Sequence, residues 1–179
     1  THPYTLASRN SLAGAYQAAG DLDRATTLFE ATLAQYEQVL GDTHPSTLAS
    51  RNDLAGAYQT AGDLDRATTL FEATLSQYEQ VLGDTHPSTL TSRNNLAGAY
   101  QAAGDLERAI PLFEATLAQR EQVLGNTHPN TRASRNHLAY ARKSAETAQQ
   151  LDATTSATDH GLRHFSGSSE QPENSHDQF

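Results

Sequence analysis

The chain has 179 residues, a hydrophobic fraction of 36% and a formal net charge of -9 at pH 7. It contains no cysteine, which excludes a disulfide framework, a thiolate metal site and a cysteine nucleophile; this suits a reducing compartment, and we expect a cytoplasmic protein. An acidic surface repels phosphate backbones, and no stretch approaches the roughly 18 apolar residues that span a bilayer, so neither nucleic acid nor a membrane is an expected partner.

An internal repeat dominates the sequence. The segment THPYTLASRN begins at Thr1 and returns in closely similar form at Thr43, Thr85 and Thr127, which gives a period of 42 residues. We expect three full units at 1–42, 43–84 and 85–126, a partial capping unit at 127–148, and a disordered polar tail at 149–179. Because the chain lacks methionine and starts in phase with a unit, we interpret it as part of a longer protein.

The first half of each unit predicts a helix, over 3–19 in the first unit. Pro3 suits a first helical turn, where the missing N–H has no partner in any case. Leu6, Leu12 and Tyr16 fall on one side at helical spacing. Gly20 can adopt the positive φ that ends a helix.

The second half predicts another helix, over 22–40. Asp21 is a typical N-cap, and Phe29 and Leu33 belong to its apolar stripe. The very short connection at Gly20 makes the two helices antiparallel. One hairpin cannot bury both stripes, but a stack of hairpins can. The fold class is therefore all-α, an α-solenoid of stacked antiparallel helix hairpins.

The fourth unit differs in character. Arg132 replaces a repeated leucine, Arg142 replaces the repeated tyrosine, and Glu146 replaces the helix-ending glycine. These changes are typical of a terminal capping helix with no neighbour to cover. Without the glycine, this helix is expected to continue toward Gln150, where the polar tail follows.

The segment from Leu12 to Tyr16, followed by Ala25 and Phe29, resembles the tetratricopeptide repeat (TPR) signature. The run VLGDTHPSTLASRNDLAGAY resembles the 42-residue repeats of kinesin light chains. The words SRN and AGDLDRA are similar to arrays in actinobacterial signalling proteins, in which the array often follows an NB-ARC-type nucleotide-binding switch. The resemblance implies a right-handed superhelix whose first helices line a concave face and bind a protein or peptide. It equally allows a regulatory array that contacts other domains of its parent.

The candidate binding residues form rows of equivalent positions on the first helices. An asparagine amide can donate and accept at once, which suits the backbone of an extended peptide; alternatively, it holds neighbouring helices. The predicted peptide-binding residues of the concave face are Asn10, Asn52, Asn94, Asn136, Arg9, Arg51, Arg93, Arg135, Gln17, Gln59, Gln101, Asp53 and Asn95.

Three further features leave alternatives open. Gly14, Gly56 and Gly98 each cost a helix roughly 1 kcal/mol relative to alanine, so they either admit a ligand or permit close helix packing. The arginine row either binds an acidic peptide or pairs with acidic side chains of a neighbouring helix. Variation at Asp53 and Asn95 either tunes specificity or is drift.

No motif in the sequence predicts catalysis or a bound cofactor. His2, His44, His86 and His128 recur once per unit, too far apart in a stack to share a metal ion, and a capping or packing role is expected. The single lysine, Lys143, does not follow a phosphate-binding glycine loop, and no G-x-S-x-G elbow occurs. We expect no catalytic residue, no metal and no cofactor.

Overall fold

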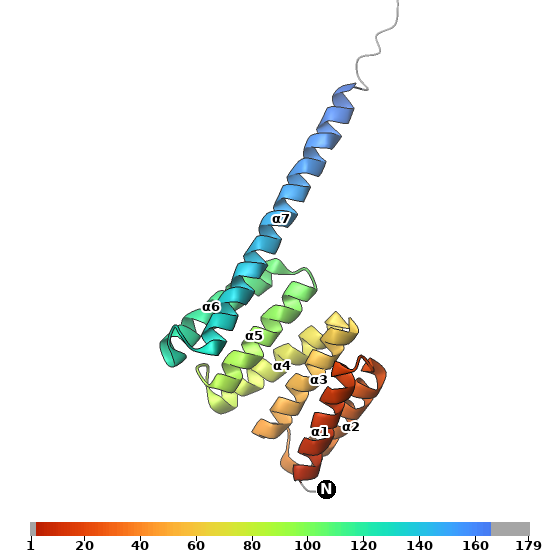
Figure 1. Cartoon of the computed structure of the whole chain (residues 1–179), viewed down its shortest axis with the longest axis vertical. Helices are drawn as coiled ribbons and strands as arrows, with labels where there is room; N and C mark the ends of the chain where they lie inside the picture. Colours follow the sequence, from red (N-terminus) through yellow and green to blue (C-terminus); the bar gives the residue numbers. More distant parts are fainter. Residues whose placement is uncertain (1–2, 166–179) are drawn as a thin grey trace, which may run out of the picture. The chain divides into compact units, whose positions relative to one another are not determined.

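The computed structural model describes residues 3–165, with side chains from 4 to 151. All regular structure in this range is helical (Figure 1). The helices are α1 (Pro3–Ala18), α2 (Leu22–Leu40), α3 (Pro45–Ala61), α4 (Leu64–Leu82), α5 (Pro87–Ala102), α6 (Leu106–Leu124) and α7 (Pro129–Phe165). None of these helices combines the length and apolar composition needed to cross a membrane.

The turn inside each hairpin is built from a glycine and an aspartate. Gly20 has a φ of +80°, a conformation that glycine adopts without a steric penalty. The amide of Asp21 donates to the carbonyl of Tyr16 at 3.0 Å, which closes the end of α1. The side chain of Asp21 then accepts from the amide of Arg24 and caps α2. The predicted helix bounds and antiparallel pairing follow directly from these few residues.

The repeated histidines cap the first helices. Nδ1 of His44 accepts from the amide of Ser46 at 3.1 Å, and His86 accepts from Ser88 at the same distance. His128 makes the equivalent bond to the amide of Asn130. The predicted capping role is confirmed at these three positions, and no group of residues that would hold a metal ion occurs in the described range.

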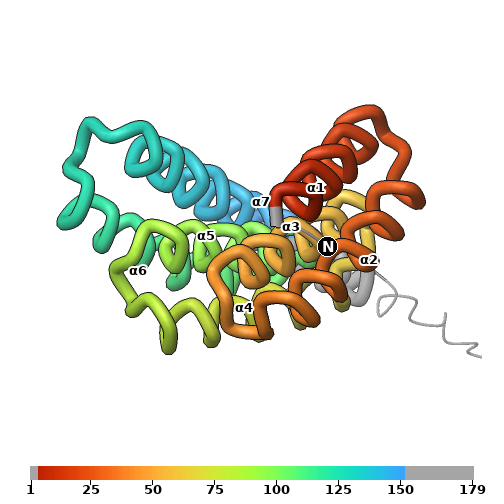
Figure 2. Tube along the Cα trace, turned by 90° about the horizontal axis from the view of Figure 1, so that it is seen from below, coloured from red at the N-terminus to blue at the C-terminus, as the bar shows by residue number. Residues whose placement is uncertain are grey.

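Apolar side chains of successive hairpins close a continuous core. Leu54 of α3 is 4% exposed and packs with Phe29 and Leu33 of the preceding hairpin. The equivalent Leu12 of α1, the first described helix, is 49% exposed. Figure 2 shows the first helices α1, α3 and α5 along the inner side of an arc and the second helices α2, α4 and α6 along its outer side.

The fourth unit closes the stack. Residues up to Arg142 belong to one compact unit with the three hairpins, and a second unit begins at Lys143. Nη2 of Arg142 donates to Glu114 at 2.7 Å, as the hydroxyl of the equivalent Tyr58 does to Glu30 at 2.5 Å. Arg132 is exposed where Leu90 is fully buried, as a capping helix requires.

The last helix is longer than the sequence pattern predicts. α7 continues past the expected end near Gln150 to Phe165, and the disordered tail at 149–179 stays a prediction. No glycine or proline interrupts the chain between Pro129 and Gly161, and the alanine, glutamine and glutamate residues after Ala145 are good helix formers. Residues 166–179 lie outside the described range, and their disorder stays a prediction.

Candidate functional site

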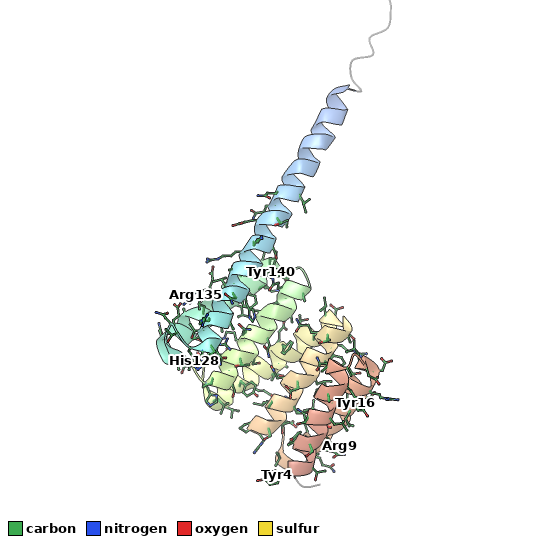
Figure 3. The ribbon with its side chains drawn as sticks, viewed as in Figure 1. Tyr4, Arg9, Tyr16, His128, Arg135 and Tyr140 are labelled. Carbon is green, nitrogen blue, oxygen red and sulfur yellow. The ribbon has the colours of Figure 1, made fainter. Side chains whose placement is uncertain are left out.

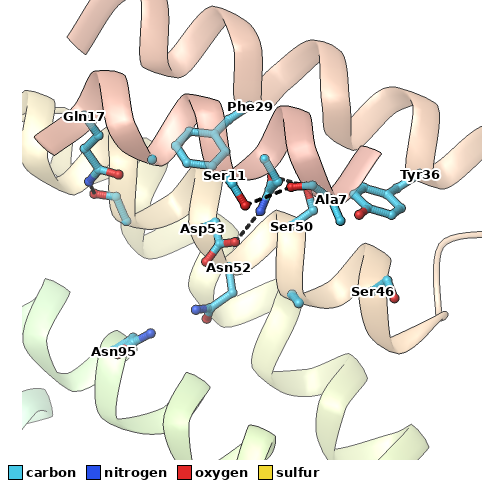
Figure 4. Close-up of a pocket in the computed structure, with 14 residues that line it drawn as sticks. Ala7, Ser11, Gln17, Phe29, Tyr36, Ser46, Ser50, Asn52, Asp53 and Asn95 are labelled. Atoms are coloured by element: carbon cyan, nitrogen blue, oxygen red, sulfur yellow. Dashed lines mark hydrogen bonds between the residues drawn. The ribbon is translucent and has the colours of Figure 1, made fainter. Parts of the chain in front are cut away.

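The first helices of the three hairpins line a groove with two adjoining hollows. The larger has a volume of about 580 Å³ and is bordered mainly by α1 and α3, with Asn95 of α5 at its edge (Figure 4). The smaller has a volume of about 320 Å³ and lies between α3 and α5. Both are lined by Ala49, Asn52 and Asp53, so the groove is continuous from α1 to α5.

Equivalent polar residues meet wherever two first helices adjoin. We call these places seams: the first seam joins α1 and α3, the middle seam joins α3 and α5, and the third seam joins α5 and α7. Each contains an asparagine, a serine, one variable residue, and a residue from the second helix between them. In this order the sets are Asn10, Ser50, Asp53 and Tyr36; Asn52, Ser92, Asn95 and Tyr78; and Asn94, Ser134, His137 and Arg120.

The first seam carries an acidic group. Nδ2 of Asn10 donates to Oδ2 of Asp53 at 2.5 Å, and the hydroxyl of Ser50 donates to Oδ1 of Asn10 at 3.1 Å. None of the ion pairs among the described residues involves Asp53. Its carboxylate stays in contact with solvent but is crowded by the groove floor. This desolvation raises the pKa of Asp53, and the bond from Asn10 opposes the rise only in part.

The third seam carries a cation in the same framework. Arg120 is 5% exposed and donates to the hydroxyl of Ser134 at 2.7 Å and to the carbonyl of Leu90 at 3.3 Å. The acceptors of its hydrogen bonds are neutral, and none of the ion pairs in the described range involves it. Burial lowers the pKa of Arg120 from its usual value, which is so high that the guanidinium keeps its charge.

His137 lies beside this cation. Its Nδ1 is 3.1 Å from Nδ2 of Asn94, and its ring contacts Phe113 with a centroid distance of 5.8 Å. Desolvation lowers the pKa of His137, and the charge of Arg120 lowers it further. The neutral imidazole is therefore favoured at neutral pH, and the positive charge of the third seam belongs to Arg120.

The middle seam is neutral and incompletely hydrogen-bonded. Oδ1 of Asn52 and Oγ of Ser92 are both buried without a partner, although the equivalent pairs in the other seams bond to each other. Asn52 and Asn95 point into the same space between α3 and α5 (Figure 4). Burial raises the pKa of Tyr78, beneath them, to about 12. This seam has spare hydrogen-bonding capacity on the groove floor.

The helix glycines face open space. Gly14 and Gly56 line the larger hollow, and a Cβ atom added at Gly14, Gly56 or Gly98 meets no atom within 4 Å. Close packing of the helices therefore does not require glycine at these positions. Of the two interpretations left open by the sequence, room for an approaching ligand fits the structure.

The arginine row does not line either hollow of the groove, and its predicted role in peptide binding stays a prediction. Nη2 of Arg51 donates to Glu37 of the preceding second helix at 2.6 Å, and Arg93 makes the equivalent bond to Glu79. Arg9 bonds to Gln35 and Arg135 to Glu121, at the two ends of the row (Figure 3). Successive side chains of a helix point in directions that are about 100° apart. When an asparagine faces the groove, the adjacent arginine therefore points toward the second helices.

The remaining predicted residues, three glutamines and one asparagine, differ in their surroundings. Nε2 of Gln17 donates to the hydroxyl of Thr60 at 2.8 Å and so helps to tie α1 to α3. Nε2 of Gln101 is buried without a partner, and Gln59 is half-buried. Asn136, in the last described helix, is exposed.

Arg120 is not among the residues predicted from the sequence, although its departure from the repeat could have indicated it. The residue stands at the position of Tyr36 and Tyr78 in the earlier units. A change from tyrosine to arginine at a core position of a second helix marks either a solvent-facing end or a buried charge. Only the structure distinguishes these, because α7 covers the position with Asn130 and Ser134.

Stacked hairpins with a polar groove on their first helices define a helical-repeat array, and comparisons with a family model and with solved structures agree with it. The family model described as tetratricopeptide repeat matches residues 4–80, 52–118 and 89–151. The chain therefore belongs to the tetratricopeptide repeat family, and its units are of the kinesin light chain type. Comparison with curated proteins gave no match.

Solved structures give the same assignment. The nearly identical TPR-like repeats of a candidate kinesin light chain from Podosopora anserina are 37% identical, with a TM-score of 0.76, over 83% of this chain and 71% of that one. BtubC (BKLC) from P. vanneervenii is 20% identical with a TM-score of 0.71, over 97% and 69%. The TPR2AB domain of yeast Sti1 in complex with pHSP90 is 16% identical with a TM-score of 0.63, over 93% and 59%. The last two show the shared fold alone.

Proposed function

We propose that this array is a non-catalytic scaffold, working in the cytoplasm, that binds an extended peptide segment of a partner protein along the groove formed by α1, α3 and α5. The observation that carries the proposal is the continuous groove, whose two hollows adjoin on α3. Asn52 lines its floor, and the buried amide oxygen of this residue has no partner, so rotation of the side chain makes it an acceptor for a peptide N–H. The open space above Gly14 and Gly56 lets a backbone approach closely.

Two features of the array support a scaffold rather than an enzyme. TPR arrays are a family of protein-interaction modules, and the yeast Sti1 structure was determined as a complex with pHSP90. The polar groups of the groove are occupied in holding the seams together or are neutral amides and hydroxyls. This suits recognition of a backbone better than proton transfer or nucleophilic attack.

Selection from a displayed library of random peptides tests the proposal. We expect selected peptides to bind the array and to lose about tenfold in affinity on Asn52→Ala. Val81→Ala is the matched control, because Val81 is 43% exposed on the second helix α4. Failure to select any peptide, or equal loss with both variants, contradicts groove binding.

The same groove suits a second function, a regulatory array in a larger NB-ARC-type signalling NTPase that contacts the parent's own domains. The feature that favours it is the similarity of the SRN and AGDLDRA segments to such arrays. Binding of the isolated array to other domains of its parent, in competition with selected peptides, would support this alternative.

A further inference from the structure

The three seams form a charge series along the first helices: the first and middle seams line the two hollows of the groove, and the third seam continues this face between α5 and α7. The variable position and the second-helix position are Asp53 and Tyr36 in the first seam, and His137 and Arg120 in the third. The framework around them is conserved, since Ser50 bonds to Asn10 and Ser134 bonds to Asn94 in the same way. The first and third seams therefore differ in charge but share the same hydrogen-bonded framework.

Neither charge has an opposite partner among the residues that the structure describes. The hydrogen bonds of Asp53 and Arg120 are to neutral groups, and the eight ion pairs of the described residues leave both out. By contrast, Arg51, Arg93, Arg135 and Arg142 each pair with a glutamate. Arg120 is buried and the carboxylate of Asp53 is partly desolvated, so each attracts a complementary charge more strongly than a charge in open water, because the surroundings screen it less.

The middle seam supplies an uncharged contact between these two ends. Ser92 is 1% exposed, it lines the smaller hollow, and its hydroxyl has no partner. The amide oxygen of Asn52 is likewise unpartnered. A buried polar atom without a partner costs about 1–3 kcal/mol, so a ligand that satisfies it recovers stability.

We infer that the groove selects a peptide segment with a basic side chain over the first seam and an acidic side chain over the third. This inference rests on the proposed peptide-binding function and adds to it the charge pattern of the ligand. Neighbouring helix axes lie about 10 Å apart, so two steps along the groove cover about 20 Å. An extended peptide advances about 3.3 Å per residue, so the basic and acidic residues are about six residues apart.

A panel of four synthetic peptides tests the inference by fluorescence anisotropy. Each has twelve residues and blocked termini: one carries a lysine pair and a glutamate pair six positions apart, one keeps only the lysines, one keeps only the glutamates, and one has glutamine at all four positions. We expect the mixed-charge peptide to bind at least about tenfold more tightly than the glutamine peptide.

Two variants assign each charge to its seam. Asp53→Asn introduces the residue of the third unit, and Arg120→Tyr introduces the residue of the first two units, so both keep side chains that the fold already accepts. We expect Asp53→Asn to weaken only lysine-containing peptides, and Arg120→Tyr to weaken only glutamate-containing peptides, each about fivefold. If Arg120→Tyr unfolds, Arg120→Gln removes the charge and retains hydrogen-bonding capacity.

The outcomes separate the inference from the function beneath it. Equal affinity for the mixed-charge and glutamine peptides overturns the charge pattern and leaves peptide binding intact. A peptide that keeps only the glutamates and binds as tightly as the mixed-charge peptide also overturns it. Absence of binding by all four peptides overturns both the charge pattern and the proposed groove.

Discussion

The first and third seams share the same hydrogen bond between neighbouring first helices but carry opposite charges. In both, a serine hydroxyl donates to an asparagine oxygen across neighbouring first helices, at 3.1 Å and 3.3 Å. The first seam adds the carboxylate of Asp53 to this framework, and the third adds the guanidinium of Arg120. The repeat therefore determines where polar groups lie along the first helices, and the residues at two variable positions determine which charge a ligand meets there.

The largest expected effect concerns the apolar layer beneath the seams. Leu54→Ala removes a side chain that is 4% exposed between two hairpins, and we expect it to lower the free energy of unfolding by about 2–5 kcal/mol. Leu12→Ala is the matched control, because the equivalent Leu12 is 49% exposed; it should cost less than about 1 kcal/mol. Urea titration followed by circular dichroism measures both, and equal costs would show that stacking does not bury this layer.

The second prediction distinguishes the third seam from the middle one. Asn94 is 8% exposed and its amide meets Ser134 and His137, so Asn94→Ala should cost about 1–3 kcal/mol. Asn52→Ala should cost less than about 0.5 kcal/mol, because it removes an oxygen that has no partner. The same urea titrations measure both changes. A larger cost at Asn52 would mean that the middle seam is not the open one.

The third prediction concerns the glycines of the groove. Gly56→Ala should leave stability unchanged or raise it by up to about 1 kcal/mol, since the added Cβ meets no atom and alanine favours helix. Its affinity for selected peptides should fall, because the methyl group occupies the groove. Gly62→Ala is the control in the hairpin turn, where a φ of +84° makes alanine unfavourable, and it should destabilise by about 1–2 kcal/mol. Thermal melts and anisotropy separate the two effects.

The smallest expected effect is a difference in pH dependence between the outer seams. The pKa of His137 is lowered on folding, so the unfolded state binds more protons, and the stability falls as pH decreases below about 6.5. The pKa of Asp53 is raised on folding, so its contribution falls as pH increases through the range just above about 4.

Matched variants isolate these two slopes. The unfolding free energy of His137→Asn and Asp53→Asn, subtracted from that of the parent protein between pH 4 and pH 8 (about four units, which span both windows), should give slopes of opposite sign. Both replacements introduce the asparagine of the third unit, Asn95. Slopes of the same sign would mean that the two seams do not differ electrostatically in the way the structure indicates.

Local chemistry made most of the fold predictable. Each of the first three units repeats Gly20, Asp21 and Gly41, so the bounds of α2, α4 and α6 follow from sequence alone. The end of α7 does not follow from the sequence in this way. It depends on the absence of a helix-ending residue rather than on a residue that is present. Helix propensity alone does not fix where such a helix ends.

The site was less predictable because it depends on rotation around a helix axis. Asn10 and Arg9 are adjacent in sequence, yet one lines the groove and the other bonds to Gln35 of a second helix. The charge of the third seam comes from Arg120, on a second helix, and the predicted rows contained only residues of first helices. A groove formed between units requires knowledge of which side chains their packing turns inward.

The most direct test of the groove is a chemical-shift titration of the isotopically labelled array with the mixed-charge peptide. We expect the largest chemical-shift changes at the backbone amides of Asn52, Gly56 and Ser92. The amides of the exposed valines on the second helices should not shift; these are Val39, Val81 and Val123. Shifts confined to those valines, with the first-helix amides unaffected, would contradict groove binding.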